Sequence, residues 1–586
     1  MTLFFQRFFW PALGCTSIVI HLYLIFSGLI PNLVSRPIHM ALALPWALIF
    51  LAKSKSAKIS GLCLTLFGCS ACIWIIFNEN SLGDQYGALE GLGQIVVAVL
   101  LLFIVIEMAR RVVGWPLPVV TILALIYGLL GQYIPGEFGY AGIPIKSFLG
   151  TLTIAEGGIW GKLTGVSVNI VAIFVIFGAV LNSGEAGQGF MNLASSAAGR
   201  LKGGAAKVSV AASALFGSIS GSASANVAST GAITLPAMIR LKYPRSLAGA
   251  VEAVASSGGQ IMPPLMGAGA FVMVELTGIS YVDIMQAALL PALLYFLAVW
   301  VGINAFTRRY ELLGLPEEET PALKLVMITS CFFLIPFGTL IWAMFGPGFT
   351  PQYAASISIL VGAILLFLDS NLKMNFHRTV RRYVETFVTA GQQIAVIASI
   401  ILCASIIIGI LGMTGLGVKI TSLILSWSGG LIWPALMLTA LACLILGMEV
   451  PTTAAYVICI SIAGPALVSL GLETLQVHLF VFWFALLSTI TPPVCGAVFI
   501  AAGMVNENWL KVAGSSMALG VGLYLIPLGM IANPDLIALG SKPVLSLIAM
   551  TKVGFALILI SFGIICPKSI IFRITLCLLG GIILFI

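Results

Sequence analysis

Long apolar runs recur along the whole chain and are separated by short polar segments. A helix needs about 20 apolar residues to cross the hydrocarbon core of a bilayer, which is about 30 Å thick. Most of the runs are close to this length, so the pattern predicts an all-α polytopic membrane protein. The predicted spans lie at 15–31, 38–52, 59–77, 93–109, 116–133, 166–183, 246–275, 283–306, 325–345, 353–370, 388–411, 477–504, 513–531, 545–565 and 572–586.

Two further apolar segments, 205–239 and 431–470, do not follow the pattern of a simple span. The first contains GSISGSASANVAST (217–230), in which hydroxyl side chains alternate with other residues. Ser and Gly are poor helix formers, and hydroxyls offer oxygen atoms to a ligand. Non-helical backbone in a bilayer persists only where protein covers it or where it lines a wet cavity. We therefore predict that each segment is a re-entrant hairpin, although small residues packed between helices would give a similar composition.

The distribution of charge supports the hairpins. Only 8% of the residues are charged, and most of the 28 Lys and Arg lie at the ends of apolar runs. With a cytoplasmic N-terminus and two hairpins, most of these basic residues fall on the cytoplasmic side, as the positive-inside rule requires. A single crossing at 205–239 would place Lys242 and Arg245 opposite Arg200 and Lys202. The net charge of +8 is therefore dispersed, and it indicates no nucleic-acid partner.

The two hairpin segments belong to an internal repeat. Pro236 and Pro465 precede the pairs Pro263–Pro264 and Pro492–Pro493 by the same interval. The repeats run over roughly 166–306 and 386–506, and the charge pattern places their hairpins on opposite sides of the membrane. Inverted repeats with broken helices near the midplane are typical of secondary transporters.

These features divide the chain into three parts. We predict an N-terminal helical scaffold at 1–150, a transport region at 151–510 with a connector at 307–385, and additional helices at 511–586. Within the connector, the basic stretch 373–382 is predicted to be an amphipathic helix on the inner surface.

The Pro-Pro pairs and the hairpins carry the candidate chemistry. Two consecutive prolines break a helix, and the freed carbonyls then face a cavity, although a single pair could be a mere kink. Carbonyl and hydroxyl oxygens suit Na⁺, whereas exposed helix N-termini suit a carboxylate. The candidates are the polar residues of the two hairpins and of the Pro-Pro segments.

Glu449, in ILGMEVPTTAAY, is the acidic residue placed deepest in an uncharged stretch. A charge near the bilayer centre costs about 2.5–3.5 kcal/mol on insertion scales, so such a residue is functional by default. The alternative is a protonated or hydrogen-bonded structural carboxyl. Glu252 and Glu275, near the ends of one predicted span, receive no assignment.

Enzyme functions find little support. The segment GSISG (217–221) lacks the central Ser of the G-x-S-x-G elbow, and Gly161-Lys162 lacks the remainder of a phosphate-binding loop. The eleven cysteines lie in apolar runs without metal-ligand spacing, so we expect packing roles and no organic cofactor. We predict that the protein is not an enzyme.

The combination of GSISGSASANVASTGAITLPAMI, GGQIMPP, LGMEVPTTAAY and TPP resembles the large membrane subunit of tripartite ATP-independent periplasmic (TRAP) transporters. More closely, it resembles the fused permease of the TAXI branch, in which the small and large membrane subunits form one polypeptide. The resemblance covers roughly 90–510. It implies a permease of the bacterial or archaeal inner membrane that takes up a small organic acid with Na⁺ by an elevator motion. A TAXI-type extracytoplasmic binding protein would deliver this substrate.

Carried over by position, the resemblance divides the candidate residues into two groups. It implies substrate contacts at Ser222, Ser224, Asn226, Gln260, Glu449, Thr452 and Thr453. It implies Na⁺ ligands at Ser218, Ser220, Gly221, Met262, Pro263, Thr489 and Thr491. One departure is that the second repeat has no arginine to clamp a carboxylate. A stand-alone Na⁺- or H⁺-coupled carboxylate symporter is the main alternative, and a channel or a lipid-modifying enzyme is a weaker one.

Overall fold

The computed structural model describes residues 8–447 and 450–586. About 80% of the chain is helical, and the described residues form no β-strand. Eleven of the described helices are long and apolar enough to cross a membrane. The predicted class, an all-α polytopic membrane protein, is confirmed.

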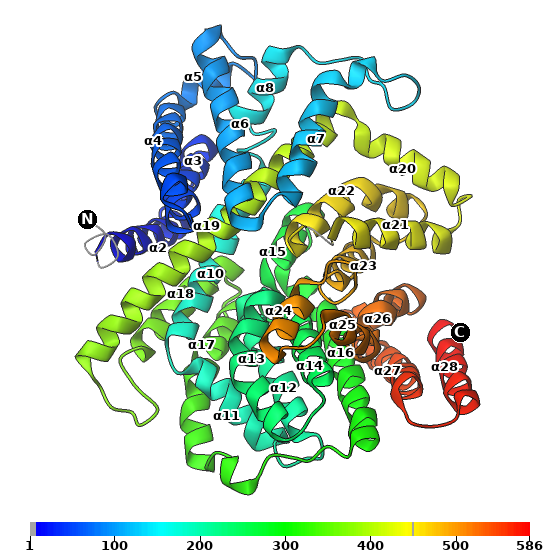
Figure 1. The fold of residues 1–586 in the computed structure, drawn as a ribbon. Helices are drawn as coiled ribbons and strands as arrows, with labels where there is room; N and C mark the ends of the chain where they lie inside the picture. The colour runs from blue at the N-terminus through cyan, green and yellow to red at the C-terminus, as the bar shows by residue number, and fades with distance from the viewer. Residues whose placement is uncertain (1–7, 448–449) are drawn as a thin grey trace.

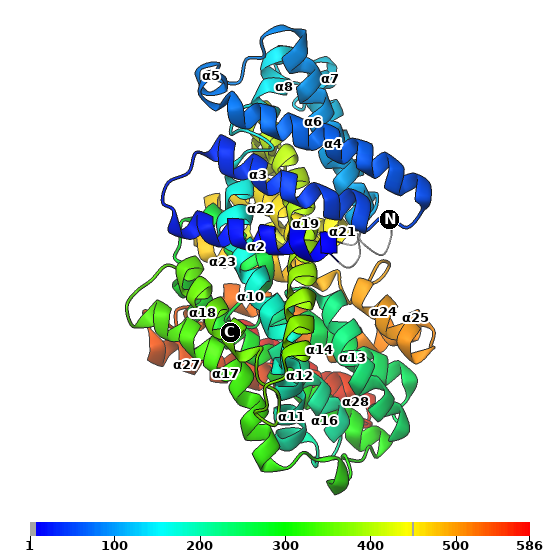
Figure 2. The same cartoon turned by 90° about the vertical axis from the view of Figure 1, so that its left-hand side faces the viewer.

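The first group of helices lies at one end of the molecule (blue to cyan in Figures 1 and 2). In chain order it contains α2 Trp10–Phe26, α3 Asn32–Pro45, η2 Trp46–Phe50, α4 Lys55–Phe77, α5 Glu79–Asp84, α6 Gly91–Val113, α7 Pro116–Leu130, η3 Gly131–Tyr133 and α8 Ile145–Thr153.

The middle of the chain contains α9 Lys162–Val166, η4 Ser167–Val171, α10 Ala172–Ser183, α11 Ala186–Ala198, α12 Gly204–Ser220, α13 Ala223–Arg240, α14 Arg245–Gly258, η5 Gly259–Ile261, α15 Gly267–Thr277, α16 Tyr281–Tyr310, η6 Glu317–Glu319, α17 Leu323–Phe345, α18 Pro351–Leu365 and α19 Phe376–Thr414. The last part contains α20 Leu416–Trp427, α21 Ile432–Gly447, α22 Thr452–Ser469, α23 Thr474–Leu487, α24 Gly496–Val505, α25 Trp509–Leu519, α26 Val521–Ala532, η7 Pro534–Ile537, α27 Pro543–Ile565 and α28 Ile570–Phe585.

The long helix α19 is the element against which the N-terminal helices pack. It has 39 residues, so it is about 58 Å long and exceeds the thickness of a bilayer. Helices α2, α3, α6 and α7 all lie against it, and it runs obliquely through the molecule in Figure 1. At Gly391 a Cβ atom would lie 2.5 Å from the Trp46 ring, so only glycine lets η2 approach this closely.

Arg111 ties the end of α6 to the neighbouring N-terminal helices. Its Nε lies 2.6 Å from Glu107 Oε1. Its guanidinium also donates to the carbonyls of Leu48, at 2.7 Å, and Ala57, at 2.6 Å. Leu48 lies in η2 and Ala57 in the first turn of α4, so Arg111 joins α6 to both elements.

A buried histidine pair joins the N-terminal group to the middle of the chain. His21 Nε2 lies 2.7 Å from His39 Nδ1, and His39 Nε2 lies 2.9 Å from the hydroxyl of Ser167. His21 Nδ1 lies 2.6 Å from the Ser17 carbonyl. The chain of hydrogen bonds therefore connects α2 and α3 with η4.

Each segment predicted to be a hairpin forms two helices joined at a tip, and a broken helix follows it. Helices α12 and α13 are followed by α14 and α15, and α21 and α22 are followed by α23 and α24. Pro236 and Pro465 lie inside α13 and α22, respectively. The Pro263–Pro264 and Pro492–Pro493 pairs lie in the non-helical segments between the paired helices.

The structure differs from one expectation about a separate element. Residues 373–382 do not form a separate surface helix, because α19 begins at Phe376, where Asn375 caps it by accepting from Arg378 N at 3.1 Å. The span expected at 513–531 lies within the candidate span Trp509–Ala532, in which the single residue Gly520 separates α25 from α26.

The two ends of the molecule carry segments that the charge pattern assigns to opposite sides of the membrane. Helices α5 and α8 lie at one end, whereas α11 and the connection between α16 and α17 lie at the other end (Figures 1 and 2). The second end carries exposed ion pairs, including Arg200 with Glu317 and Arg240 with Glu319.

The hairpin topology can be tested with cysteines introduced at exposed positions. We expect Lys202→Cys and Lys242→Cys to react only with reagents that reach the cytoplasm, because both arms of the first hairpin return to that side. Leu431→Cys and Gly471→Cys should react from outside. The exposed Cys63 and Cys331 are first replaced by Ser to remove background labelling. Reaction of positions 202 and 242 from opposite faces would contradict the hairpin.

Candidate functional site

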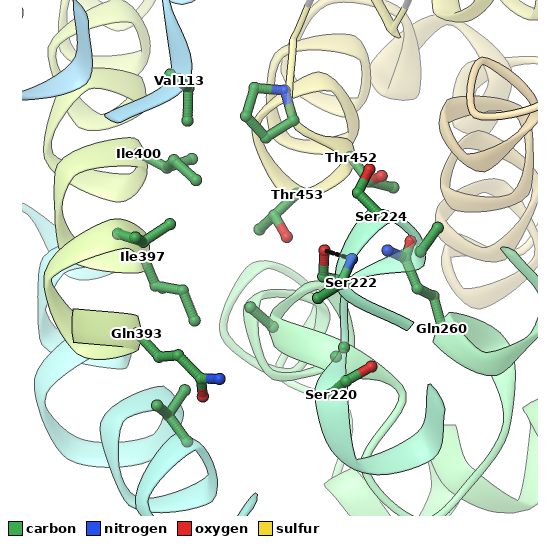
Figure 3. A pocket seen from close by; sticks show the side chains of 18 of the residues that line it. Val113, Ser220, Ser222, Ser224, Gln260, Gln393, Ile397, Ile400, Thr452 and Thr453 are labelled. Atoms are coloured by element: carbon green, nitrogen blue, oxygen red, sulfur yellow. Dashed lines mark hydrogen bonds between the residues drawn. The ribbon is translucent and has the colours of Figure 1, made fainter. Parts of the chain in front are cut away.

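A cavity of about 660 Å³ lies between α19 and the two hairpin tips. Figure 3 shows its two walls facing each other. Gln393, Ile397 and Ile400 of α19, with Val113 at the end of α6, form one wall. Ser220, Ser222, Ser224, Gln260, Thr452 and Thr453 belong to the hairpin tips and broken helices opposite. The volume is in the range of small-molecule sites.

The first hairpin tip is formed by Gly221 and Ser222. Gly221 has a φ angle of +60°, which ends α12 in the left-handed region that favours glycine. The Ser222 hydroxyl accepts from Ala225 N at 3.4 Å and caps α13. The α13 amino-terminus thus begins at the cavity.

The tip packs against the first broken helix through pairs of glycines. A Cβ atom at Gly217 would lie 2.4 Å from the Gly259 Cα, and one at Gly221 would lie 2.8 Å from the Gly267 Cα. Such distances exclude any side chain at these positions. Backbone-to-backbone contact therefore joins the hairpin to the segments on both sides of the Pro263–Pro264 break.

Two oxygen atoms near this tip have no hydrogen-bond partner among the described residues. They are the Ser220 hydroxyl and the Asn226 Oδ1, and both are buried. Asn226 Nδ2 donates to the Ser213 carbonyl at 3.0 Å, which leaves Oδ1 as an open acceptor. Buried polar atoms are usually paired, so unpaired oxygens are features expected of an ion or ligand site.

The second hairpin tip brings another helix amino-terminus to the cavity. Gly447, Val450, Pro451, Thr452 and Thr453 line it. Helix α22 begins at Thr452 without a side-chain cap, so its first N–H groups lack partners within the helix. Glu449 lies outside the described residues.

The cavity is uncharged over the part of its wall that the structure describes. The lining side chains are apolar, hydroxyl or amide groups. Each helix N-terminus carries the equivalent of roughly half a positive charge, so α13 and α22 together favour an anion. The arrangement can bind an acidic group without an arginine.

The broken helices are held by tyrosines that the sequence analysis did not identify. The Tyr281 hydroxyl donates to the carbonyls of Pro264 and Leu265. The Tyr524 hydroxyl lies 2.7 Å from Thr491 Oγ1. In an apolar surrounding, each hydroxyl satisfies polar groups released by the break.

The predicted site residues fall into two sets. Those that line the cavity are Ser220, Gly221, Ser222, Ser224, Gln260, Thr452, Thr453 and Thr489. Those among the described residues that do not line it are Ser218, Asn226, Met262, Pro263 and Thr491. The Ser218 hydroxyl donates to the Leu215 carbonyl at 2.7 Å, and Thr489 Oγ1 lies 2.8 Å from the Ser257 hydroxyl.

Gln392 and Gln393 of α19 are polar lining residues that the sequence analysis missed. In Figure 3 the Gln393 amide projects into the cavity from the wall opposite Ser220. Two adjacent glutamines inside an apolar span were the available signal. No group of three or more His, Cys, Asp or Glu side chains suited to a metal ion occurs in the described part of the chain.

A polar cavity enclosed by interrupted helices in the middle of a helical membrane protein is typical of a transport protein. Comparison with known families agrees with this class. Residues 100–545 match the family described as "Tripartite ATP-independent periplasmic transporter, DctM component". The chain therefore belongs to the DctM family of TRAP transporters.

Three individual relatives are similar to this chain over 64% to 95% of their own length. The isethionate TRAP transporter permease protein DctMQ of Oleidesulfovibrio alaskensis is 25% identical over 67% of this chain and 64% of that protein. The C4-dicarboxylate TRAP transporter large permease protein DctM of Vibrio cholerae is 24% identical over 72% of this chain and 92% of its own. The ectoine/5-hydroxyectoine permease UehC of Ruegeria pomeroyi is 23% identical over 70% and 95%, respectively.

These similarities define the class and the location of the protein. The relatives are transporter permeases and not enzymes. Family membership and the eleven candidate spans place the chain in the inner membrane.

The glycine contact at the first hairpin can be tested by Gly217→Ala. We expect a loss of about 1–3 kcal/mol of stability, because the added methyl overlaps the Gly259 backbone. Gly338→Ala is the control, since no atom lies within 4 Å of its Cβ position. The thermal unfolding midpoints of the purified variants report the difference. A Gly217→Ala midpoint as high as that of Gly338→Ala would show that the tip does not pack in this way.

Proposed function

We propose that this chain is the permease of a TRAP transporter of the TAXI branch. It takes up a small organic acid together with Na⁺, and an extracytoplasmic TAXI-type binding protein delivers the acid. The relatives are named for isethionate, C4-dicarboxylates and ectoine. Motif resemblance to fused permeases supports the TAXI assignment.

The observation that carries this proposal is the meeting of two helix amino-termini at one cavity whose described lining is uncharged. The N–H groups at the starts of α13 and α22 supply donors for a carboxylate. Hydroxyl and amide side chains add neutral donors and acceptors for the rest of the substrate. A carboxylate held in this way does not require the arginine that the second repeat lacks.

Sodium coupling is supported by the supply of unpaired oxygens at the first tip. Ser220 lines the cavity, and its buried hydroxyl has no hydrogen-bond partner among the described residues. Neutral oxygen ligands suit a hard monovalent cation. Each positive charge that enters down the membrane potential contributes about 2.3 kcal/mol per 100 mV to uptake.

The elevator motion is supported by the way the cavity divides the molecule. The hairpin tips pack on the broken helices through backbone contacts, including the Gly217–Gly259 pair, and so form one body. The opposite wall belongs to α19, which the N-terminal helices hold from the other side. Sliding the body formed by the hairpins and broken helices along α19 would expose the cavity alternately to the two sides of the membrane.

A docking surface for the binding protein is proposed at 78–92, 134–165 and 412–430. These segments include α5, α8 and α20, and α5 and α8 lie at the end of the molecule assigned to the outside (Figure 1). A transient contact of this kind needs only a small interface with polar groups. A stand-alone symporter would need no such surface.

The sodium site can be tested with Ser220→Ala. We expect the Na⁺ concentration for half-maximal uptake to rise about tenfold if the lost oxygen contributes about 1.4 kcal/mol to Na⁺ binding. Ser229→Ala is the matched control, because this exposed hydroxyl of the same hairpin donates to the Ala225 carbonyl. Uptake is measured in proteoliposomes at several Na⁺ concentrations. Uptake that depends on a proton gradient and ignores Na⁺ would contradict sodium coupling.

Partner dependence separates the tripartite transporter from a stand-alone symporter. In proteoliposomes with an inward Na⁺ gradient, we expect negligible uptake of a free organic acid by this protein alone. Addition of the TAXI-type binding protein loaded with the same radiolabelled acid should restore uptake. Robust saturable uptake without any added protein would favour the symporter.

A further inference from the structure

Glu252 is a fully buried carboxyl group that has no role in the site described above. It lies in the middle of α14, with 0% of its surface exposed, and faces the arms of the first hairpin. It does not line the 660 Å³ cavity. In Figure 1, α14 lies beside α12 and α13 in the lower part of the molecule.

Five hydroxyl groups surround the Glu252 carboxyl. Ser209 Oγ lies 2.8 Å from Oε2, and Ser213 Oγ and Ser256 Oγ lie 3.4 Å and 3.3 Å from Oε1. The hydroxyls of Thr230 and Thr234 hydrogen-bond to Oε1 and Oε2, respectively. The side chains come from α12, α13 and α14, and all are buried.

No positive charge from the packed helices reaches this carboxyl within the part of the chain that the structure describes. On α12, the Lys207 ammonium lies 5.1 Å from the centre of the Trp300 ring. At the end of α13, Arg240 pairs with Glu319. At the start of α14, Arg245 donates to the Val505 carbonyl at 3.2 Å.

The remaining neighbours of α14 are equally occupied or uncharged. On α25, Lys511 pairs with Glu507 at 3.5 Å. On α16, the Tyr295 hydroxyl donates to the Val254 carbonyl at 2.7 Å. Also on α16, Asp283 accepts from the Ser280 hydroxyl, and Arg308 and Arg309 lie over the Phe562 and Tyr310 rings, respectively. Helix α24 and η5 contain no Asp, Glu, Lys, Arg or His. Hydroxyls therefore provide the polar contacts of Glu252 among the described residues.

These hydroxyls can form hydrogen bonds with the Glu252 carboxyl group both when it is ionised and when it is protonated. A hydroxyl is both a donor and an acceptor. Thr230 Oγ1 also lies 2.8 Å from the Asn226 carbonyl, and Thr234 Oγ1 lies 3.0 Å from the Thr230 carbonyl. When Glu252 is ionised, these threonines donate to the carboxylate. When it is protonated, it donates to a threonine, which turns its own hydrogen to the backbone carbonyl.

The same network extends toward the hairpin tip. The Ser213 hydroxyl lies 3.1 Å from Thr230 Oγ1, and the Ser213 carbonyl accepts from Asn226 Nδ2. Asn226 in turn lies against Gly217 at the tip contact. Thr230 is about 12 Å along α13 from Ser222, at 1.5 Å per residue. Hydrogen bonds therefore link Glu252 to Asn226, and packing of Asn226 against Gly217 carries the connection on to the tip.

We propose that Glu252 and its five hydroxyl partners form a proton-binding site between the first hairpin, α12 and α13, and the following helix α14. The exchange adds one proton to the carboxylate from water and releases it again, with no other bond changed. The whole cluster belongs to α12, α13 and α14. A bound proton therefore travels with these helices in the proposed elevator motion. This last step rests on the proposed elevator function, whereas proton binding itself does not.

Infrared difference spectroscopy of the full-length protein in lipid nanodiscs tests this site without substrate or binding protein. Spectra are compared between about pH 5 and about pH 9, a range in which ordinary Asp and Glu side chains, with pKa values of about 4, are already mostly ionised. We expect a protonated-carboxyl stretching band that shifts in D₂O and is lost in Glu252→Gln. Glu275→Gln, at an exposed position of α15, should retain the band.

A second variant keeps the test informative if Glu252→Gln fails to fold. Ser209→Ala removes one donor to the carboxyl and should shift the frequency of the band without abolishing it. An identical pH difference spectrum in wild type and Glu252→Gln would overturn the proposal. So would a Glu252 signal that responds to added Na⁺ but not to pH, which would indicate a cation site. Because no transport is measured, failure of the proposed uptake function would leave this result unchanged.

Discussion

The absence of water in the bilayer core governs how this chain interrupts its helices. Every N–H or C=O group released at a break needs another partner, because hydrocarbon supplies none. At the first break, Tyr281 supplies hydrogen bonds to two carbonyls. The Gly217–Gly259 and Gly221–Gly267 contacts cover the remaining backbone by bringing it against other backbone. The glycine contacts keep the first break packed against the first hairpin.

Two places among the described residues can accommodate negative charge without a neighbouring cation. At the cavity, the amino-termini of α13 and α22 offer N–H groups and partial positive charge. Around Glu252, five hydroxyls take the same role. Neutral donors of this kind can reorient, so they adapt to a ligand or a proton that comes and goes. A fixed arginine would bind more strongly and release less readily.

Arginine side chains instead join neighbouring elements by donating hydrogen bonds to their backbone carbonyls. Arg111 ties α6 to carbonyls of the N-terminal helices, and Arg382 of α19 donates to the carbonyls of Leu366 and Leu368. The planar guanidinium suits such contacts because it offers several donors in a fixed geometry. These residues help to hold α19 in place on one side of the cavity.

Much of the architecture was readable from the sequence, because lipid imposes simple local rules. The length of apolar runs predicted the spans, and the Pro-Pro pairs marked where helices break. The density of hydroxyls between Gly217 and Thr230 indicated the segment that forms the first tip. The cavity-lining residues Ser220, Ser222 and Ser224 were found in this way.

Other features depend on contacts between distant segments and were decided only by the tertiary structure. The sequence gives no reason to distinguish Ser218 from Ser220, yet the Ser218 hydroxyl donates to the Leu215 carbonyl, whereas the Ser220 hydroxyl is buried without a hydrogen-bond partner among the described residues. Gln393 faces the cavity only because α19 packs beside the tips. Glu252 gains its hydroxyl shell from three helices. Local composition determines which segments can be broken or helical, whereas the partners of each polar group depend on which helices meet.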